Sequence, residues 1–193
     1  MKNPRVKINT ITNLSDAWNR LDRVNFNYQI KNGTWQNQDR ESYFTGDGAC
    51  ILLYNIAKNT VILIKQFRMP SYIDRDNDGM MIEVCAGLLD NDDPVTCIIK
   101  EVEEETGYKI DTVKKVLEVY SSPGAMTEKL YYFITEYNET MKVSDGGGLV
   151  SETEEIEVLE YNFDTALKMI NSGEIKDAKT ILLLQYIRIN RIM

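Results

Sequence analysis

Short apolar stretches separated by polar turns run through most of the chain. Strand-like stretches lie within 5–44, where three are expected, and at 49–54, 61–67, 80–85, 116–121, 129–137 and 156–162. Longer stretches with helical spacing lie at 94–106, 163–171 and 178–192. Asn32-Gly33, between strand-like runs at 26–30 and 34–38, is a strong signal for a hairpin turn. The pattern predicts an α+β fold with mixed strand pairing.

The same pattern divides the chain into two parts. Residues 1–45 contain strand signals only and predict a small antiparallel β subdomain. Residues 46–193 contain all the predicted helices and the remaining strands, and predict the main domain.

The helix predicted at 94–106 has clear start and stop signals. Asp92-Asp93-Pro94 combines acidic capping residues with proline in the first turn, and Gly107 is a common helix terminator. The spacing i, i+3, i+4, i+7 predicts one buried apolar stripe, made of Val95, Ile98, Ile99 and Val102.

Acidic residues crowd the second half of this helix. Four of the five residues from Glu101 to Glu105 are Glu, and Glu101, Glu104 and Glu105 fall away from the apolar stripe. Like charges at i, i+4 cost an isolated helix roughly 0.2–0.5 kcal/mol each, and acids near a helix C-terminus oppose its dipole. The cluster therefore predicts either a site for a hard cation such as Mg²⁺ or Mn²⁺, or a solvated helix face.

Composition narrows the chemistry. The chain has no histidine and a formal net charge of −8, which excludes Ser-His-Asp catalysis and His-ligated zinc and argues against a nucleic-acid partner. Its three cysteines, Cys50, Cys85 and Cys97, have no metal-binding spacing and predict buried thiols in a reducing compartment. Without an apolar run of the roughly 20 residues that span a bilayer, or a signal-peptide core, we expect a cytoplasmic protein with no membrane partner.

One polar segment resembles a calcium-binding loop. Residues 74–79 begin with alternating acidic positions and a glycine, as such loops do. Cys85 stands where the pattern requires a glutamate, so we expect a polar turn.

Residues 86–108 resemble the Nudix box, GX5EX7REUXEEXGU, where U is a large apolar residue. The segment from Lys100 to Tyr108 matches its helical half, with Lys100 in place of the usual arginine. In the front half, Asp92 takes the glutamate position, and either Ala86 or Gly87 takes the glycine position. The strands before the box and the segment Ser122-Pro123-Gly124 extend the similarity to the ADP-ribose and nucleotide-sugar pyrophosphatase branch, nearest to the members that cleave GDP-mannose.

This resemblance implies a Nudix fold, with mixed β-sheets sandwiched between helices, and a metal-dependent hydrolase. Its metal ligands would be Glu101, Glu105 and the Ala86 carbonyl, with Glu104 as a ligand or its support. A glutamate on a later loop would position or deprotonate water and contact metal, and Glu154 is the first choice before Glu152. Glu105 would also belong to the catalytic set.

The resemblance also implies the substrate contacts. Cationic contacts would come from Arg68 and Lys179. The remaining contacts would come from Trp18, Asp39, Arg40, Glu41, Ala86, Gly87, Leu88 and Glu128. Trp18 could stack on a base, with ordinary strand packing as the alternative.

The activity implied is Mg²⁺- or Mn²⁺-dependent hydrolysis of a nucleoside-diphosphate sugar, with GDP-mannose giving GMP and mannose 1-phosphate. The alternatives are cleavage of ADP-ribose and a non-catalytic nucleotide-binding module on the same fold. The resemblance further implies a homodimer that exchanges its N-terminal subdomain.

Overall fold

A computed structural model describes the chain except residues 1, 75–77, 150 and 152. Its contacts form two compact units, one of residues 1–47 and 119–129, the other of residues 48–118 and 130–193. The division near residue 47 lies close to the subdomain boundary expected after residue 45. Among the described residues, no helix is long and apolar enough to cross a membrane.

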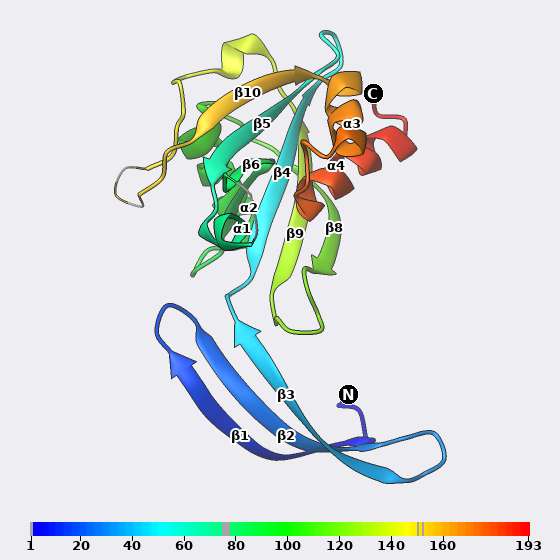
Figure 1. Cartoon of the computed structure of the whole chain (residues 1–193). Coiled ribbons are helices and arrows are strands. Elements are labelled where there is room, and N and C mark those ends of the chain that lie inside the picture. The colour runs from blue at the N-terminus through cyan, green and yellow to red at the C-terminus, as the bar shows by residue number, and fades with distance from the viewer. Residues whose placement is uncertain (1, 75–77, 150, 152) are drawn as a thin grey trace. The chain divides into compact units, whose positions relative to one another are not determined.

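The first unit is built on an antiparallel sheet of β1 (Val6–Asp16), β2 (Arg20–Gln29) and β3 (Trp35–Phe44), in that order (Figure 1). The chain reverses at the predicted Asn32-Gly33, but through a longer connection, since Ile30 N–H donates to the Thr34 carbonyl at 2.9 Å. Segment 119–129 joins this unit where Tyr43 N–H donates to the Ala125 carbonyl at 2.8 Å. All residues of β1 are exposed, so this strand buries neither face within the chain.

The second unit contains a mixed sheet in the order β10-β5-β4-β9-β8. Its strands are β4 (Gly48–Asn55), β5 (Thr60–Phe67), β8 (Lys114–Tyr120), β9 (Lys129–Glu136) and β10 (Glu157–Asn162). β4 pairs parallel with β9 and antiparallel with β5, which confirms the mixed pairing.

The strand predicted at 80–85 is two strands. β6 (Met80–Glu83) pairs with β5, whereas β7 (Cys85–Leu88) pairs with β4. At the break, Val84 N–H donates 2.8 Å to the Thr180 hydroxyl. The split was not predictable from an apolar run because it depends on which strand each half meets.

Helices cover both faces of this sheet. α2 (Pro94–Glu101) packs with the alternate β4 residues Ala49, Ile51 and Leu53 in one buried cluster. α3 (Phe163–Ser172) contacts β5 and β10, and α4 (Ala178–Ile189) contacts β4. Figure 1 shows α3 and α4 together beside the sheet, apart from α2. Two short helices, α1 (Met69–Ile73) and a 3₁₀ turn at Glu139–Met141, were not predicted.

The predicted helix at 94–106 is correct in position and differs in its second half. α2 ends at Glu101, and the chain continues as a π-helical turn, Val102–Thr106, that ends at Gly107 with φ 75°. Ile98 and Val102 are fully buried as predicted, but Val95 is 43% exposed. Cys97 is buried instead, 3% exposed.

Candidate active site

The acidic helix end lies against the backbone of β7. Glu105 is 1% exposed, and its Oε2 accepts a hydrogen bond from the Ala86 N–H at 3.1 Å. The Glu101 carboxylate lies so close to Gly87 that a Cβ there would be 2.0 Å from Glu101 Oε1. Gly87 therefore makes room for Glu101, and two of the three predicted acidic ligands reach the same short stretch of strand.

A π-helical turn carries these glutamates. A π turn has one more residue than an α turn, and such turns are frequent at functional sites. It leaves carbonyls without helical partners, and two glycines supply them: Gly147 N–H donates to the Glu105 carbonyl at 3.0 Å, and Gly148 N–H to the Glu104 carbonyl at 3.1 Å. The two glycines therefore anchor the later loop to the acidic turn.

Glu154 belongs to that anchored loop. Its Oε2 accepts a hydrogen bond from Leu149 N–H at 3.0 Å, and a Cβ on Gly148 would come within 2.6 Å of the same oxygen. Its alternative, Glu152, lies outside the described residues.

Within the protein alone, the surroundings of the buried Glu105 carboxyl disfavour its ionised form. Burial raises the pKa of Glu105 to about 8, and the nearby Glu101 and Glu154 act in the same direction. The Cys85 thiol and the Ala86 N–H oppose this shift without cancelling it. Since a divalent cation would favour the ionised form, the donor set fits a hard metal ion.

The described residues contain no ready-made group of three acidic or thiol side chains around one metal position. Mg²⁺ is usually held by only one or two carboxylates, with water and substrate phosphates completing its shell. The Ala86 carbonyl, on the strand that Glu101 and Glu105 both reach, is a further oxygen of the required kind.

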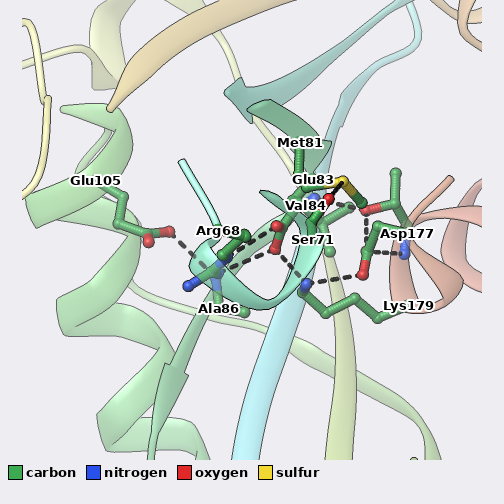
Figure 2. A network of polar contacts seen from close by, with 10 residues as sticks. Arg68, Ser71, Met81, Glu83, Val84, Ala86, Glu105, Asp177 and Lys179 are labelled. Atoms are coloured by element: carbon green, nitrogen blue, oxygen red, sulfur yellow. Dashed lines mark hydrogen bonds and ion pairs between the residues drawn. The ribbon is translucent and has the colours of Figure 1, made fainter. Parts of the chain in front are cut away.

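Positive charge comes from residues far apart in sequence. Arg68 makes a two-pronged ion pair with Glu83, with Nε to Oε1 at 2.9 Å and Nη2 to Oε2 at 3.0 Å. Lys179, at the start of α4, also contacts Glu83 and lies 3.0 Å from Asp177. Figure 2 shows Arg68 between this ion-pair group and the Ala86–Glu105 contact.

Sequence reasoning missed Glu83. The available signal was a charged residue inside the apolar run 80–85, which is uncommon unless the charge is paired. Burial tends to raise the pKa of Glu83, but Arg68 and Lys179 outweigh it and lower the pKa to about 2.

A cavity of about 870 Å³ brings two predicted site residues together. Arg68 lines it from the end of β5, and Glu154 lines it from the loop before β10. The volume falls within the roughly 300–1,000 Å³ typical of small-molecule sites. The arrangement can place an anionic ligand between a cation and a carboxylate.

The two aspartates before α2 have separate roles. Asp92 pairs with Lys100 at 2.5 Å. Asp93 caps the helix by accepting from Val95 N–H at 3.0 Å and Thr96 N–H at 3.2 Å. The front half of the box therefore stabilises the helix that carries the acidic residues.

The remaining candidates lie mostly in the first unit. Trp18 is 92% exposed, so ordinary strand packing does not explain it. On β3, Arg40 Nη1 donates to the Asp39 carbonyl at 2.7 Å, and Glu41 lies 3.6 Å from Arg23. Glu128 accepts at its carbonyl from Ser121 N–H at 3.2 Å. In the second unit, Leu88 is 50% exposed at the end of β7.

Two minor predictions have different outcomes. Cys50, Cys85 and Cys97 are buried and form no disulfide, as expected. Of the segment resembling a calcium loop, residues 75–77 lie outside the described part. A strand, β6, follows it from Met80.

Two family descriptions match the chain. "GDP-mannose pyrophosphatase NudK N-terminal domain" matches residues 5–43, and "NUDIX domain" matches residues 45–182. Curated GDP-mannose pyrophosphatases are also similar. The Yersinia enterocolitica protein is 50% identical over 190 residues, which cover 97% of this chain and 98% of that protein. The Salmonella typhimurium protein is 49% identical over 180 residues, 93% of each chain, and the Escherichia coli O1:K1 protein is 47% identical over the same shares.

Proposed function

Because the chain belongs to the Nudix family, with a matching domain over residues 45–182, we propose that it hydrolyses the diphosphate of a nucleoside-diphosphate sugar. The leading substrate is GDP-mannose, cleaved to GMP and mannose 1-phosphate. The similarity to GDP-mannose pyrophosphatases along nearly the whole chain supports this choice. The observation that carries it in the structure is that Arg68 and Glu154 line one cavity and both interact electrostatically with the buried Glu105.

The proposed metal is Mg²⁺, with Mn²⁺ as the alternative. Glu101, Glu105 and the Ala86 carbonyl would hold it, with Glu104 and Glu154 as further ligands or supports. The bound ion would polarise the diphosphate and offset the charge that develops on the leaving phosphate. The raised pKa of Glu105, to about 8, supports a cation at this position.

The chain's own residues would divide the remaining work. Arg68 would attract and orient the diphosphate through charge-assisted hydrogen bonds. Glu154 would accept a proton from the attacking water or hold it in line, since a carboxylate can act as a general base and the chain has no histidine. Glu152 is the second candidate for that role.

Other contacts are proposed from the family resemblance. Lys179, Gly87 and Leu88 would contact the substrate within the second unit. Trp18, Asp39, Arg40, Glu41 and Glu128 would contribute from the first unit. The 92% exposure of Trp18 supports a stacking role, worth roughly 1–3 kcal/mol on single-stranded nucleic acid.

We also propose a homodimer that exchanges its N-terminal subdomain. Ile8 and Ile11, on β1, are 60% and 59% exposed. A strand that exposes large apolar residues along its whole length commonly marks an interface. We propose a cytoplasmic location from the sequence pattern, and three buried cysteines that form no disulfide support it.

The direct test is turnover by the purified protein. With Mg²⁺ and GDP-mannose, we expect GMP and mannose 1-phosphate in equal amounts, separated by ion-exchange chromatography. Chelation by EDTA should stop the reaction, and Mg²⁺ or Mn²⁺ should restore it. Faster cleavage of ADP-ribose would move the chain to the neighbouring activity, and binding without turnover would identify a nucleotide-binding module.

A further inference from the structure

One buried carboxylate joins the two cations of the site. Glu83 is 2% exposed, and both of its oxygens are engaged. Oε1 accepts from Arg68 Nε, and Oε2 accepts from Arg68 Nη2 and from Lys179. Arg68 follows β5 and Lys179 lies in the first turn of α4, so Glu83 links elements more than 100 residues apart along the sequence (Figure 2).

The geometry points to Glu83 as a positioning residue, which fixes the Arg68 guanidinium and the Lys179 ammonium for binding of the substrate diphosphate. This inference rests on the proposed function. Glu83 itself is buried beneath the two cations, so it acts through them.

The two-pronged contact fixes the direction of the guanidinium. A guanidinium has five N–H donors in a rigid plane, and a carboxylate that takes Nε and Nη2 sets the orientation of that plane. The N–H groups on Nη1 lie outside this pair. Arg68 also lines the cavity and its side chain is 42% exposed, so one edge is held while the residue still borders the cavity.

Charge balance explains why Lys179 joins the pair. Glu83 alone would cancel the charge that Arg68 offers to a phosphate. Lys179 offsets Glu83 in turn and also contacts Asp177 at 3.0 Å, which accepts from the Thr180 N–H at the start of α4, where the helix dipole favours a negative charge. The two cations and two carboxylates sum to zero, so the group holds Arg68 in place without a net charge.

A purely structural role would predict a different pattern of contacts. The Val84–Thr180 hydrogen bond already ties the β6–β7 break to α4 with neutral groups. A buried ion pair is in general a weak source of stability, because burying charge costs about as much as pairing returns. Joining these elements would therefore not by itself explain a buried charge at Glu83.

The test is steady-state hydrolysis of GDP-mannose with Mg²⁺ by the full chain carrying Glu83→Gln. Glutamine keeps the shape but lacks the negative charge that holds the two cations. We expect KM to rise by roughly 10- to 100-fold, the size expected when charge-assisted hydrogen bonds to the substrate are lost, while kcat changes by less than about threefold, as for lost binding that ground and transition states share. Glu83→Asp, which keeps the charge on a shorter side chain, should recover part of the affinity.

A matched control separates positioning from stability. Glu160→Gln removes a carboxylate that contacts Lys58, Thr60 and Tyr137, and it should lower Tm without changing KM. A double-mutant cycle adds a second criterion: in an Arg68→Ala, Lys179→Ala background, Glu83→Gln should have almost no further effect on KM. A folded Glu83→Gln protein with wild-type KM, or additive effects in the cycle, would overturn the inference.

The inference can still be tested if Glu83→Gln does not fold or if the wild-type chain shows no turnover. If Glu83→Gln does not fold, Glu83→Asp carries the test, and an unchanged KM there overturns the inference. If the wild-type chain shows no turnover, the proposed function fails. Calorimetric affinity for GDP-mannose with Mg²⁺ then replaces KM: a loss in Glu83→Gln supports the positioning role, and an unchanged affinity refutes it.

Discussion

The Ala86 N–H donates to the Glu105 carboxylate at 3.1 Å, and this contact ties the acidic turn to the strand that supplies a backbone oxygen. It holds a nearly inaccessible carboxylate beside Glu101, whose side chain lies over Gly87. The site is therefore assembled by strand backbone and helix end together, and a change in either is expected to affect activity.

Glu105→Gln should remove activity while preserving the fold. The amide cannot supply the charge that holds a cation, so we expect kcat to fall by at least about 100-fold, as when one electrostatic stabilising group is lost. The matched control is Glu103→Gln, an exposed glutamate of the same π turn, which should keep wild-type turnover. Comparable rates for both variants in the GDP-mannose assay would contradict the role of Glu105.

The metal-free protein should become less stable as pH rises through neutrality. The pKa of Glu105 is about 8 in the folded chain, above the ordinary value of 4.5. Because the folded state prefers the protonated carboxyl, the free energy of unfolding falls as the pH rises from 4.5 to about 8, and this loss of stability is complete above about pH 8. Thermal melts in EDTA should show this slope, and Glu105→Gln should flatten it. Stability that rises across the window would refute the assignment.

Gly148→Ala should displace the Glu154 carboxylate and so impair its proposed role with the attacking water. Gly148 has φ 80°, and an added Cβ would come within 2.6 Å of Glu154 Oε2, so the carboxylate must move. We expect kcat to fall by roughly tenfold or more, since small displacements of positioned groups are costly. The control is Gly33→Ala, with φ 87° and no atom within 4 Å of the new Cβ. It should lose stability by about 1 kcal/mol and keep its kcat; equal kcat losses in both variants would contradict the prediction.

Substitutions of the two aspartates before α2 should differ in their effect on the free energy of unfolding. Asp93→Ala removes the N-cap of the helix and should cost about 1 kcal/mol in the free energy of unfolding. Asp92→Ala breaks only an exposed pair with Lys100, and such a pair is worth about 0–1 kcal/mol. Urea denaturation measures both differences. A larger loss for Asp92→Ala would show that its pairing, and not the cap, secures the helix.

The proposed dimer predicts a clear effect of charge on β1. Ile11→Asp should give monomers, because a carboxylate at the centre of an interface would be buried without a partner. Ile189→Asp places the same change at a residue of α4 that is 74% exposed, and it should leave the mass unchanged. Size-exclusion chromatography with light scattering distinguishes the two. A wild-type monomer would remove the exchanged subdomain from the proposal.

Local sequence determined much of this protein. The period of apolar residues, the Asp93 cap and the Gly107 terminator set the position of the acidic helix, because each acts within a few residues along the chain. The clustered glutamates left a cation site and a solvated helix face open, and the resemblance of Lys100 to Tyr108 to the Nudix box favoured the cation site. The mixed sheet followed from the alternation of strands and helices.

Only tertiary structure decided how the site is held. The break between β6 and β7 depends on separate partners in β5 and β4, and the π turn depends on N–H donors from Gly147 and Gly148. The link from Arg68 through Glu83 to Lys179 joins residues that no local pattern connects. Such contacts arise when distant segments pack together, so burial and charge pairing are fixed by the fold, whereas capping and periodicity are fixed along the chain.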